Sequence, residues 1–282
     1  MRQTNKIRKG IAWLLCTVLV LGILPMLPQM SMQISAAENA ASVFVDGVEL
    51  HAGGKEYFKN GDTADSGATG TYEDHSAYYD TAGELWLNNL EAHTIKANGN
   101  LTIYVCNNQA TNTNIVTATQ NETAIEVTGY LTIRYGGYGG GTGSLTVESD
   151  GKEAIQAGSG MTVSDGVEVK ARAKSGATAI SSGGVLKIDG IRTKLEAAGD
   201  GSTGKGIFAQ QSIYVKNSAV LTAFGGAAAY ESPSGIDKSG YGYEDYNVFT
   251  GDAAPGTQAA KDTVLDLSLI HISEPTRHAQ IS

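Results

Sequence analysis

One short pattern recurs five times along this chain and limits the possible folds more than any other feature. An isoleucine that follows a small residue or a threonine returns at intervals of 30, 30, 25 and 27 residues. A second apolar residue stands six positions later, and a β-branched residue two positions after that. The three sets are Ile95, Ile125, Ile155, Ile180 and Ile207; Leu101, Leu131, Met161, Leu186 and Ile213; and Ile103, Ile133, Val163, Ile188 and Val215. Because one such repeat cannot bury its own apolar face, the pattern predicts repeats that stack on one another.

A third apolar pair follows in most copies and completes a repeat of three short strands. We place these pairs at Leu145 with Val147, Val167 with Val169, Thr193 with Leu195, and Leu221 with Ala223, while Ile115 and Val116 both qualify in the first copy. An earlier, degenerate copy is expected at Tyr79, Leu85 and Leu87. Alternation at period two puts such residues on one face of each strand. The predicted fold is all-β, a right-handed single-stranded parallel β-helix with about 27 residues per coil.

The alternative fold is an antiparallel β-sandwich, which also has many short strands and turns. A sandwich gives no reason for a six-residue offset that holds through five successive copies. The most variable link also favours the solenoid. A glycine-rich insertion separates Ile133 from Leu145, whereas three residues separate Val163 from Val167. Solenoids accept such insertions, since they bulge from one coil without changing how the coils stack.

The first 37 residues have the order of a secretory signal peptide. Four basic residues lie before position 10, an apolar run spans 11–27, and small residues follow at 35–37. We predict cleavage after Ala37, with a transmembrane anchor as the alternative because the run is nearly long enough to span a bilayer. The protein is therefore predicted to be extracellular or at the cell surface. Cleavage leaves Cys106 as the one remaining cysteine, so no intrachain disulfide is expected.

Residues 267–282 are interpreted as a non-native tail. The stretch from Leu267 to Arg277 resembles the in-frame translation of a transposon-end adapter used in building sequencing libraries. This resemblance implies that the sequence is a fragment and that the native chain continues past Asp266; a genuine short apolar tail is the alternative. Between the signal peptide at 1–37 and this tail, we expect three parts. They are an N-terminal cap region at 38–84, the solenoid at 85–226 and a closing segment at 227–266.

The charge balance excludes two classes of partner. Residues 38–266 contain 15 basic and 28 acidic residues, which gives a net charge of −13. A domain with this charge repels nucleic acid and anionic lipid. We therefore expect no nucleic-acid partner, and contact with a membrane only through the signal peptide during export.

No arrangement typical of a catalytic or cofactor site emerges from the sequence. Polysaccharide lyases and glycosidases need clustered carboxylates, but the candidates here stand apart beside glycines, as expected of turns: Asp150, Asp165, Asp189 and Asp200. The densest ionisable patch, Glu73-Asp74-His75 with Asp80, is interpreted as a solvated loop, with a metal site as the alternative. The glycines at 136–143 are not followed by a helical pattern, which argues against a nucleotide site. We predict no metal, no cofactor and no catalysis.

Several stretches resemble the β-helical surface proteins of Gram-positive gut bacteria. These are Gly143-Ser-Leu-Thr-Val147, the segment from Ala179 to Ile188, and Tyr246-Asn-Val-Phe-Thr-Gly251, which is similar to the stretch that closes such solenoids. The resemblance implies a surface-displayed, adhesin-like parallel β-helix. It extends to a related group of carbohydrate-binding β-helices with calcium sites, whose ligands are Asp pairs beside the small residue and isoleucine. Here that step reads Asn121-Glu-Thr-Ala124 or Ser175-Gly-Ala-Thr178, so calcium ligation does not carry over.

Outward-facing aromatic residues are the candidate binding residues. Trp86 stands between Leu85 and Leu87, so alternation turns it outward. It is expected to head an outward column that continues with Thr102, Thr132, Thr162, Lys187 and Tyr214. Tyr135 and Tyr138 are expected to project from the glycine-rich insertion, and Tyr241, Tyr243 and Tyr246 cluster near the end.

Exposed aromatic rings suit stacking on sugars or contact with a partner protein. We therefore predict a non-catalytic adhesin or glycan-binding module that uses Trp86, Tyr135, Tyr138 and Tyr214, with a polysaccharide or a host glycoprotein as its ligand. In the alternative placement, Trp86 packs under the N-terminal cap. The alternative functions are the binding portion of a truncated polysaccharide-active enzyme and a passive surface stalk.

Overall fold

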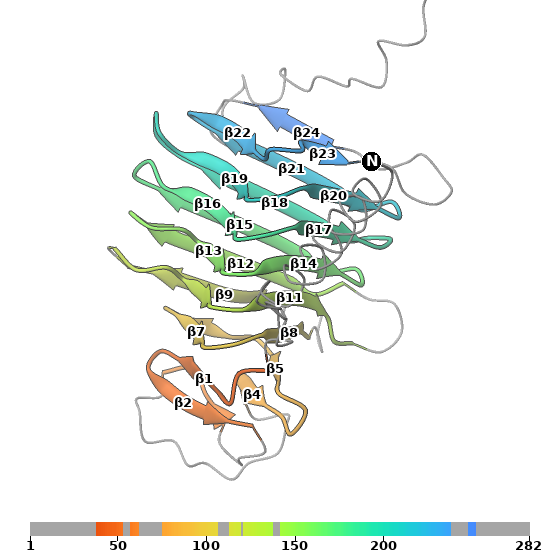
Figure 1. Ribbon diagram of the computed structural model, residues 1–282. Coiled ribbons are helices and arrows are strands. Elements are labelled where there is room, and N and C mark those ends of the chain that lie inside the picture. Colours follow the sequence, from red (N-terminus) through yellow and green to blue (C-terminus); the bar gives the residue numbers. More distant parts are fainter. Residues whose placement is uncertain are drawn as a thin grey trace, which may run out of the picture. The chain divides into compact units, whose positions relative to one another are not determined.

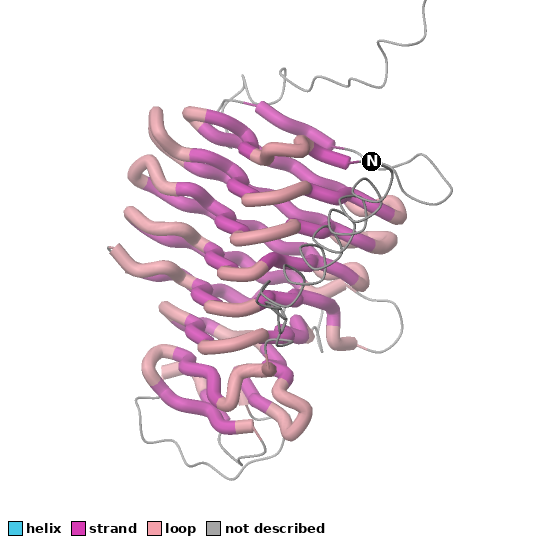
Figure 2. The backbone as a smooth tube through the Cα atoms, in the orientation of Figure 1, coloured by secondary structure: helices cyan, strands magenta, loops and turns pink. Residues whose placement is uncertain are grey.

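The computed structural model describes residues 38–52, 57–61, 75–106, 113–119, 121–137 and 142–237, and the backbone of 248–251. All regular secondary structure in these residues is β-strand (Figure 2). No helix in the described part of the chain is long and apolar enough to cross a membrane. The predicted signal peptide, Tyr138, the tyrosines at 241–246 and the tail at 267–282 lie outside the described residues.

The strands form three sheets that run side by side along a stack of coils (Figure 1). The eight-stranded sheet contains, in spatial order, β2 (Val48–His51), β1 (Ser42–Val45), β7 (Ile95–Ala97), β10 (Ile125–Val127), β13 (Ile155–Ala157), β16 (Thr178–Ser182), β19 (Lys205–Ala209) and β22 (Ala228–Glu231). The nine-stranded sheet contains β23 (Ile236–Asp237), β20 (Ile213–Lys216), β17 (Leu186–Asp189), β14 (Gly160–Ser164), β11 (Tyr130–Tyr135), β8 (Leu101–Val105), β5 (Glu84–Leu87), β4 (Ala77–Tyr79) and β3 (Tyr57–Phe58). The seven-stranded sheet contains β24 (Val248–Gly251), β21 (Val220–Gly225), β18 (Lys194–Gly199), β15 (Glu168–Lys174), β12 (Ser144–Asp150), β9 (Thr113–Ala118) and β6 (Glu91–Ala92).

Each coil contributes one strand to every sheet, and equivalent strands of successive coils pair in parallel. The chain makes about five such turns, roughly 26 residues apart. This arrangement confirms the parallel β-solenoid and excludes the sandwich, whose strands would pair antiparallel. Pairing between coils also satisfies the backbone hydrogen bonds that a single coil leaves unpaired.

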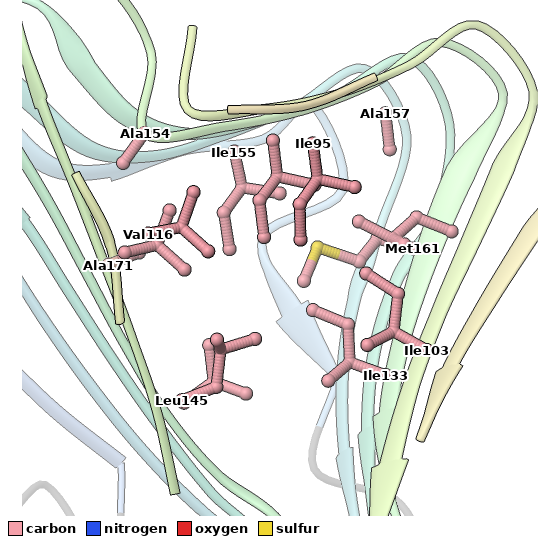
Figure 3. Packing of buried hydrophobic residues seen from close by; sticks show 14 of the residues in the cluster. Ile95, Ile103, Val116, Ile133, Leu145, Ala154, Ile155, Ala157, Met161 and Ala171 are labelled. Carbon is pink, nitrogen blue, oxygen red and sulfur yellow. The ribbon is translucent and has the colours of Figure 1, made fainter. Parts of the chain in front are cut away.

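The two apolar columns predicted from the repeat are confirmed residue by residue. The five isoleucines are direct cross-strand partners from Ile95 through to Ile207. The second set pairs in the same way from Leu101 through to Ile213. All ten side chains are buried. Figure 3 shows members of both columns, with Leu145 and Val116, pointing into one common interior.

The third column differs from the predicted one by two residues in two coils. Leu145 pairs with Val169, which pairs with Leu195, so the inward pairs are Val169 with Ala171 and Leu195 with Ala197. Val167 and Thr193 lie two residues before these inward pairs, next to the turn that precedes each strand. Thr193 is buried there because its hydroxyl accepts a hydrogen bond from Gly166 N (2.9 Å) and donates one to Asp189 O (2.8 Å). Its hydrogen bonds fix the turn that leads into β18.

A buried asparagine takes the place of leucine in the first copy of the third column. Asn114 pairs with Leu145, and Val116 is the inward member while Ile115 faces outward. The Asn114 amide accepts a hydrogen bond from Leu90 N (3.0 Å) and donates one to Ser144 O (3.3 Å). These bonds connect the first coil to its neighbours, and they satisfy a polar group that would be costly to bury without partners.

The earlier, degenerate copy is also in a different register from the one predicted. Leu85 pairs in parallel with Ile103 and Leu87 with Val105, while Tyr79 pairs antiparallel with Leu85. The strands before β5 therefore pair antiparallel with one another and with the solenoid: β1 with β2 and β7, β3 with β4, and β4 with β5. The β1–β2 hairpin turns at Asp46-Gly47, with φ of 50° and 80°. Two positive φ values are characteristic of the two-residue turn that Asp-Gly favours.

Candidate ligand-binding face

The outward face of the nine-stranded sheet carries an unbroken column of polar residues along the solenoid axis. Thr102, Thr132, Thr162, Lys187 and Tyr214 are direct partners on successive strands. We call this set the axial column. Its members lie one strand spacing apart, about 4.8 Å, on a backbone that neighbouring coils hold in place.

Trp86 does not head the axial column as the sequence predicted. Glu84 pairs with Thr102, whereas Trp86 pairs with Tyr104 in the next outward column. The cause is that the earlier copy is shifted by two residues: Leu85 pairs with Ile103 and not with Leu101. Trp86 does face outward, between the buried Leu85 and Leu87, but it is half-buried.

The Trp86 ring is held by its neighbours on more than one side. Its ring stacks on Tyr104 with centroids 4.2 Å apart and planes 8° apart. Its indole Nε1 donates to Asp80 Oδ2 (2.9 Å), and Gly136 passes so close that a Cβ there would lie 3.0 Å from Trp86 Cζ3. The Arg134 guanidinium lies over the Tyr104 ring at 5.3 Å. We call Trp86, Tyr104 and Arg134 the aromatic stack.

Within the aromatic stack, neighbouring side chains cover the faces of the Tyr104 ring. Burial raises the pKa of the Tyr104 hydroxyl; the Arg134 charge lowers it and Glu84 raises it further. Tyr104 is covered on one side by Trp86 and has Arg134 over its ring, so its faces are not open to a sugar. Stacked rings of this kind stabilise the structure. We therefore interpret the stack as a brace for the first coils of the solenoid.

Of the two tyrosines that were expected to project from the glycine-rich insertion, the structure describes Tyr135. Tyr135 is the last residue of β11 and pairs with Val105, which faces the core. Its side chain is half-buried and packs against the hydrophobic core, so it does not project into solvent. The physical reason is that the inward alternation of Leu131 and Ile133 continues to Tyr135. Tyr138 lies outside the described residues.

Tyr130, like Tyr104, is an aromatic residue of this sheet that the sequence interpretation missed. It is the first residue of β11, and its hydroxyl is 2.7 Å from the hydroxyl of Thr162 on the next strand, β14. The side chain therefore lies diagonally across the sheet instead of standing out from it. Its cross-strand partner is Gly160, where a Cβ would lie 2.7 Å from Tyr130 Cε2. Glycine at 160 leaves room for the ring beside the axial column.

A signal for Tyr130 exists in the sequence. The position before the second apolar set reads Asn100, Tyr130, Gly160, Val185 and Ser212. A bulky ring is thus followed one coil later by glycine. In a stacked fold, a large side chain in one coil and a glycine at the equivalent position of the next coil predict that the ring lies over the glycine.

Tyr214 lies at the far end of the axial column. It is half-buried on β20, and the Lys216 ammonium lies over its ring at 4.8 Å. Thr132 and Tyr214 are separated by three strand steps, which corresponds to roughly 14 Å. Tyr130 thus lies beside the axial column at Thr162, and Tyr214 lies within the column, next to Lys187.

Two ion pairs lie on or beside this face. Arg134 lies 2.7 Å from Asp165, and Lys187 lies 2.6 Å from Asp189. Burial alone would raise the pKa of Asp189, but hydrogen bonds from Lys187 and Asn217 and the charges of Lys187 and Lys216 lower it below its ordinary value. The protein as a whole is acidic, and this face presents the hydroxyls of Thr102, Thr132, Thr162 and Tyr214 beside these two ion pairs.

The ionisable patch near the cap is not arranged as a metal site in its described part. His75 is buried and its ring stacks on Tyr57 at 3.9 Å. Asp80 accepts hydrogen bonds from Ala82 N, Glu84 N and Trp86 Nε1. Glu73 and Asp74 lie outside the described residues. Within the described residues, no three His, Cys, Asp or Glu side chains are close enough to hold a metal ion.

Comparisons of the chain with protein-family models, with curated proteins and with solved structures found no match.

Proposed function

We propose that this protein is a non-catalytic, surface-displayed β-solenoid that binds an extended, neutral polysaccharide along the outward face of its nine-stranded sheet. The observation that carries the proposal is that the Tyr130 side chain reaches across the sheet, with its hydroxyl 2.7 Å from that of Thr162 in the next coil. A ring in this position is suited to lie under the apolar face of a sugar. The adjoining hydroxyls of the axial column supply donors and acceptors for the sugar hydroxyls.

The rigidity of the face supports the proposal. Each member of the axial column belongs to a strand paired on both sides by other coils. Binding therefore costs little additional ordering of the protein, so several weak contacts can add up along one ligand. The ligand is expected to be a neutral polymer, because the net negative charge of the domain would repel an anionic one.

The pairing of acidic side chains supports a non-catalytic role. Seven acidic side chains of the described residues lie within salt-bridge distance of a lysine or arginine: Asp165 with Arg134, Asp189 with Lys187, Glu196 with Arg172, Glu148 with Lys174, Glu168 with Lys170, Glu122 with Lys96, and Glu231 with Lys205. A glycosidase needs one carboxylic acid that keeps its proton beside a second carboxylate. Burial opposes ionisation of Asp189, but hydrogen bonds from Lys187 and Asn217 and the nearby lysine charges lower its pKa, which favours the ionised form instead.

The test is binding of the secreted protein to a panel of immobilised glycans. Tyr130→Thr should reduce binding to the recognised polysaccharide at least ten-fold, because it removes the ring and keeps a strand-forming residue. Phe208→Thr is the matched control, since Phe208 is an outward aromatic on β19 of the eight-stranded sheet, and it should bind as the wild type does. Trp86→Ala should lower stability more than affinity.

Three results would overturn the proposal. Undiminished binding by Tyr130→Thr would remove the site, and absence of binding to any neutral glycan would favour a passive stalk. Release of reducing sugar ends, or of unsaturated products, by the protein alone would favour the enzyme alternative.

A further inference from the structure

A separate open pocket lies beside the N-terminal hairpin, on the eight-stranded sheet. Its volume is about 390 Å³, and it is lined by Phe44, Asp46, Gly47, His93, Thr94, Lys96 and Glu122. Phe44 on β1 and Lys96 on β7 are direct antiparallel partners, so their outward side chains start from adjacent points of the sheet. Figure 1 shows β1 next to β7 at this end of the solenoid. The pocket thus forms where the antiparallel hairpin meets the first coils.

The wall of the pocket on the hairpin side is fixed by one carboxylate. Asp46 Oδ1 accepts hydrogen bonds from His93 N (2.6 Å) and Thr94 N (2.8 Å), and Asp46 N donates to Thr94 O (3.0 Å). Asp46 Oδ2 lies 3.3 Å from His93 Nδ1. These contacts join the hairpin turn to the segment before β7. The shape of the pocket therefore exists before any ligand arrives, which reduces the cost of binding.

The lining of the pocket combines an exposed ring with one donor and one acceptor. Phe44 is 39% exposed, which is unusual for a phenylalanine in a fold that buries most of its large apolar side chains. Lys96 Nζ and Glu122 Oε1 lie 3.7 Å apart, and both side chains are about half exposed. Lysine only donates hydrogen bonds and an ionised glutamate only accepts them. Two neighbouring hydroxyls of one ligand can therefore engage both without breaking the ion pair.

The size and charge of the pocket narrow the ligand class. Ligand pockets usually measure about 300 to 1,000 Å³, so this one suits a ligand of one or two sugar units and not a long chain. The charged groups of the pocket are already engaged, because Glu122 pairs with Lys96 and Asp46 accepts hydrogen bonds from His93 N and Thr94 N, so a charged ligand would have to compete with these contacts. A neutral molecule with one apolar face and several hydroxyls is complementary to Phe44, Lys96 and Glu122 together.

We infer that this pocket is a second carbohydrate site, which binds a single neutral hexopyranose unit with the apolar face of the sugar on Phe44 and two adjacent hydroxyls on Lys96 and Glu122. The site does not share residues with the proposed site at Tyr130, so either one can be correct without the other.

The test is saturation-transfer NMR with methyl glycosides of neutral hexoses and with their disaccharides, using the mature secreted protein. At least one methyl hexoside should show transfer from aromatic protein protons, with millimolar affinity. Phe44→Thr should weaken this binding at least ten-fold, and Glu122→Gln should weaken it measurably while leaving the Phe44 ring in place. Ile191→Thr is the matched control, because Ile191 is the other large apolar side chain on the described surface that is strongly exposed (72%).

The outcomes separate the two sites. Loss of monosaccharide binding in Phe44→Thr, with polymer binding retained, supports the pocket; Tyr130→Thr should show the reverse. Absence of transfer from every neutral hexoside overturns the inference, and so does undiminished binding by both Phe44→Thr and Glu122→Gln. Preference for a charged sugar or for a peptide would also overturn it. Thermal unfolding of each variant shows whether it has folded. If Phe44→Thr does not fold, the effect of Glu122→Gln on hexoside binding tests the pocket instead.

Discussion

Replacement of Gly183 by alanine tests how closely successive coils approach at their turns. Gly183 lies between β16 and β17, directly over Gly158 of the preceding coil. A Cβ at position 183 would lie 1.9 Å from Gly158 O and 2.7 Å from Gly158 C. Real Cβ atoms essentially never come closer than 3.0 Å to another heavy atom, so the two coils would have to separate by about 1.1 Å at this turn.

The loss in the free energy of unfolding comes from the hydrogen bond that this separation breaks and from the overpacking that it creates. Gly183 N donates to Ala157 O at 2.8 Å, and an added 1.1 Å would lengthen this contact beyond hydrogen-bonding distance. A lost backbone hydrogen bond costs about 0.5 to 1.5 kcal/mol, and overpacking adds about 1 to 3 kcal/mol. We therefore expect Gly183→Ala to lower the free energy of unfolding by about 2 to 4 kcal/mol.

The assay is urea unfolding followed by circular dichroism, together with amide hydrogen exchange. Gly47→Ala is the matched control: it has φ of +80° and open space within 4 Å, so it carries backbone strain of roughly 1 to 2 kcal/mol without a clash. Exchange of the Gly183 amide should be faster in Gly183→Ala and unchanged in Gly47→Ala. A Gly183→Ala protein as stable as the wild type would show that the coils are not packed as closely as described.

Four further predictions test other parts of the structure. Ile155→Ala should lower the free energy of unfolding by about 2 to 5 kcal/mol in a urea titration, because it leaves a cavity in the middle of the isoleucine column; a loss below 1 kcal/mol would contradict the burial. Because its pKa is lowered from an ordinary value of 3.8, Asp189 stabilises the folded state above that value. This contribution is lost as the pH falls below about 4. Asp189→Asn should therefore be less stable at pH 7 and lose less stability between pH 5 and pH 3, as thermal unfolding at each pH will show; equal pH profiles would refute this. Tyr104→Leu should cost about 0.5 to 1.5 kcal/mol in stacking and shift the fluorescence of Trp86 to longer wavelength, whereas an unchanged spectrum would argue against the stack. Mass spectrometry of the secreted protein should find a mature N-terminus just after Ala37, and an intact N-terminus would favour the anchor alternative.

The fold was predictable because stacking imposes the same demand on every coil. The small residue, the isoleucine and the apolar residue six positions later must align from coil to coil, so they repeat visibly in the sequence. The third strand was harder to place, since alanines such as Ala171 and Ala197 fill its second inward position and carry a weak apolar signal. The register of Leu85 was also missed, because the strands before β5 pair antiparallel and follow no repeat.

The candidate site was only partly predictable for a different reason. Alternation identifies which side chains face outward, and it did so correctly for Trp86 and Tyr214. It does not show what lies next to them in the neighbouring coil. The contacts of Trp86 with Tyr104 and of Tyr130 with Thr162 depend on register between residues 18 and 32 positions apart. The glycine at 160 indicates where the Tyr130 ring lies, but the contact of Trp86 with Tyr104 becomes apparent only from the three-dimensional stacking.

The central claim is that a neutral polysaccharide binds along the axial column, and NMR chemical-shift mapping tests it most directly. The mature protein would be titrated with an oligosaccharide of the glycan that it retains on the panel. We expect the largest shifts at Tyr130, Thr132, Thr162 and Tyr214, on one face of the nine-stranded sheet. Shifts confined to the seven-stranded sheet, or none at these four residues while the oligosaccharide is bound, would contradict the claim.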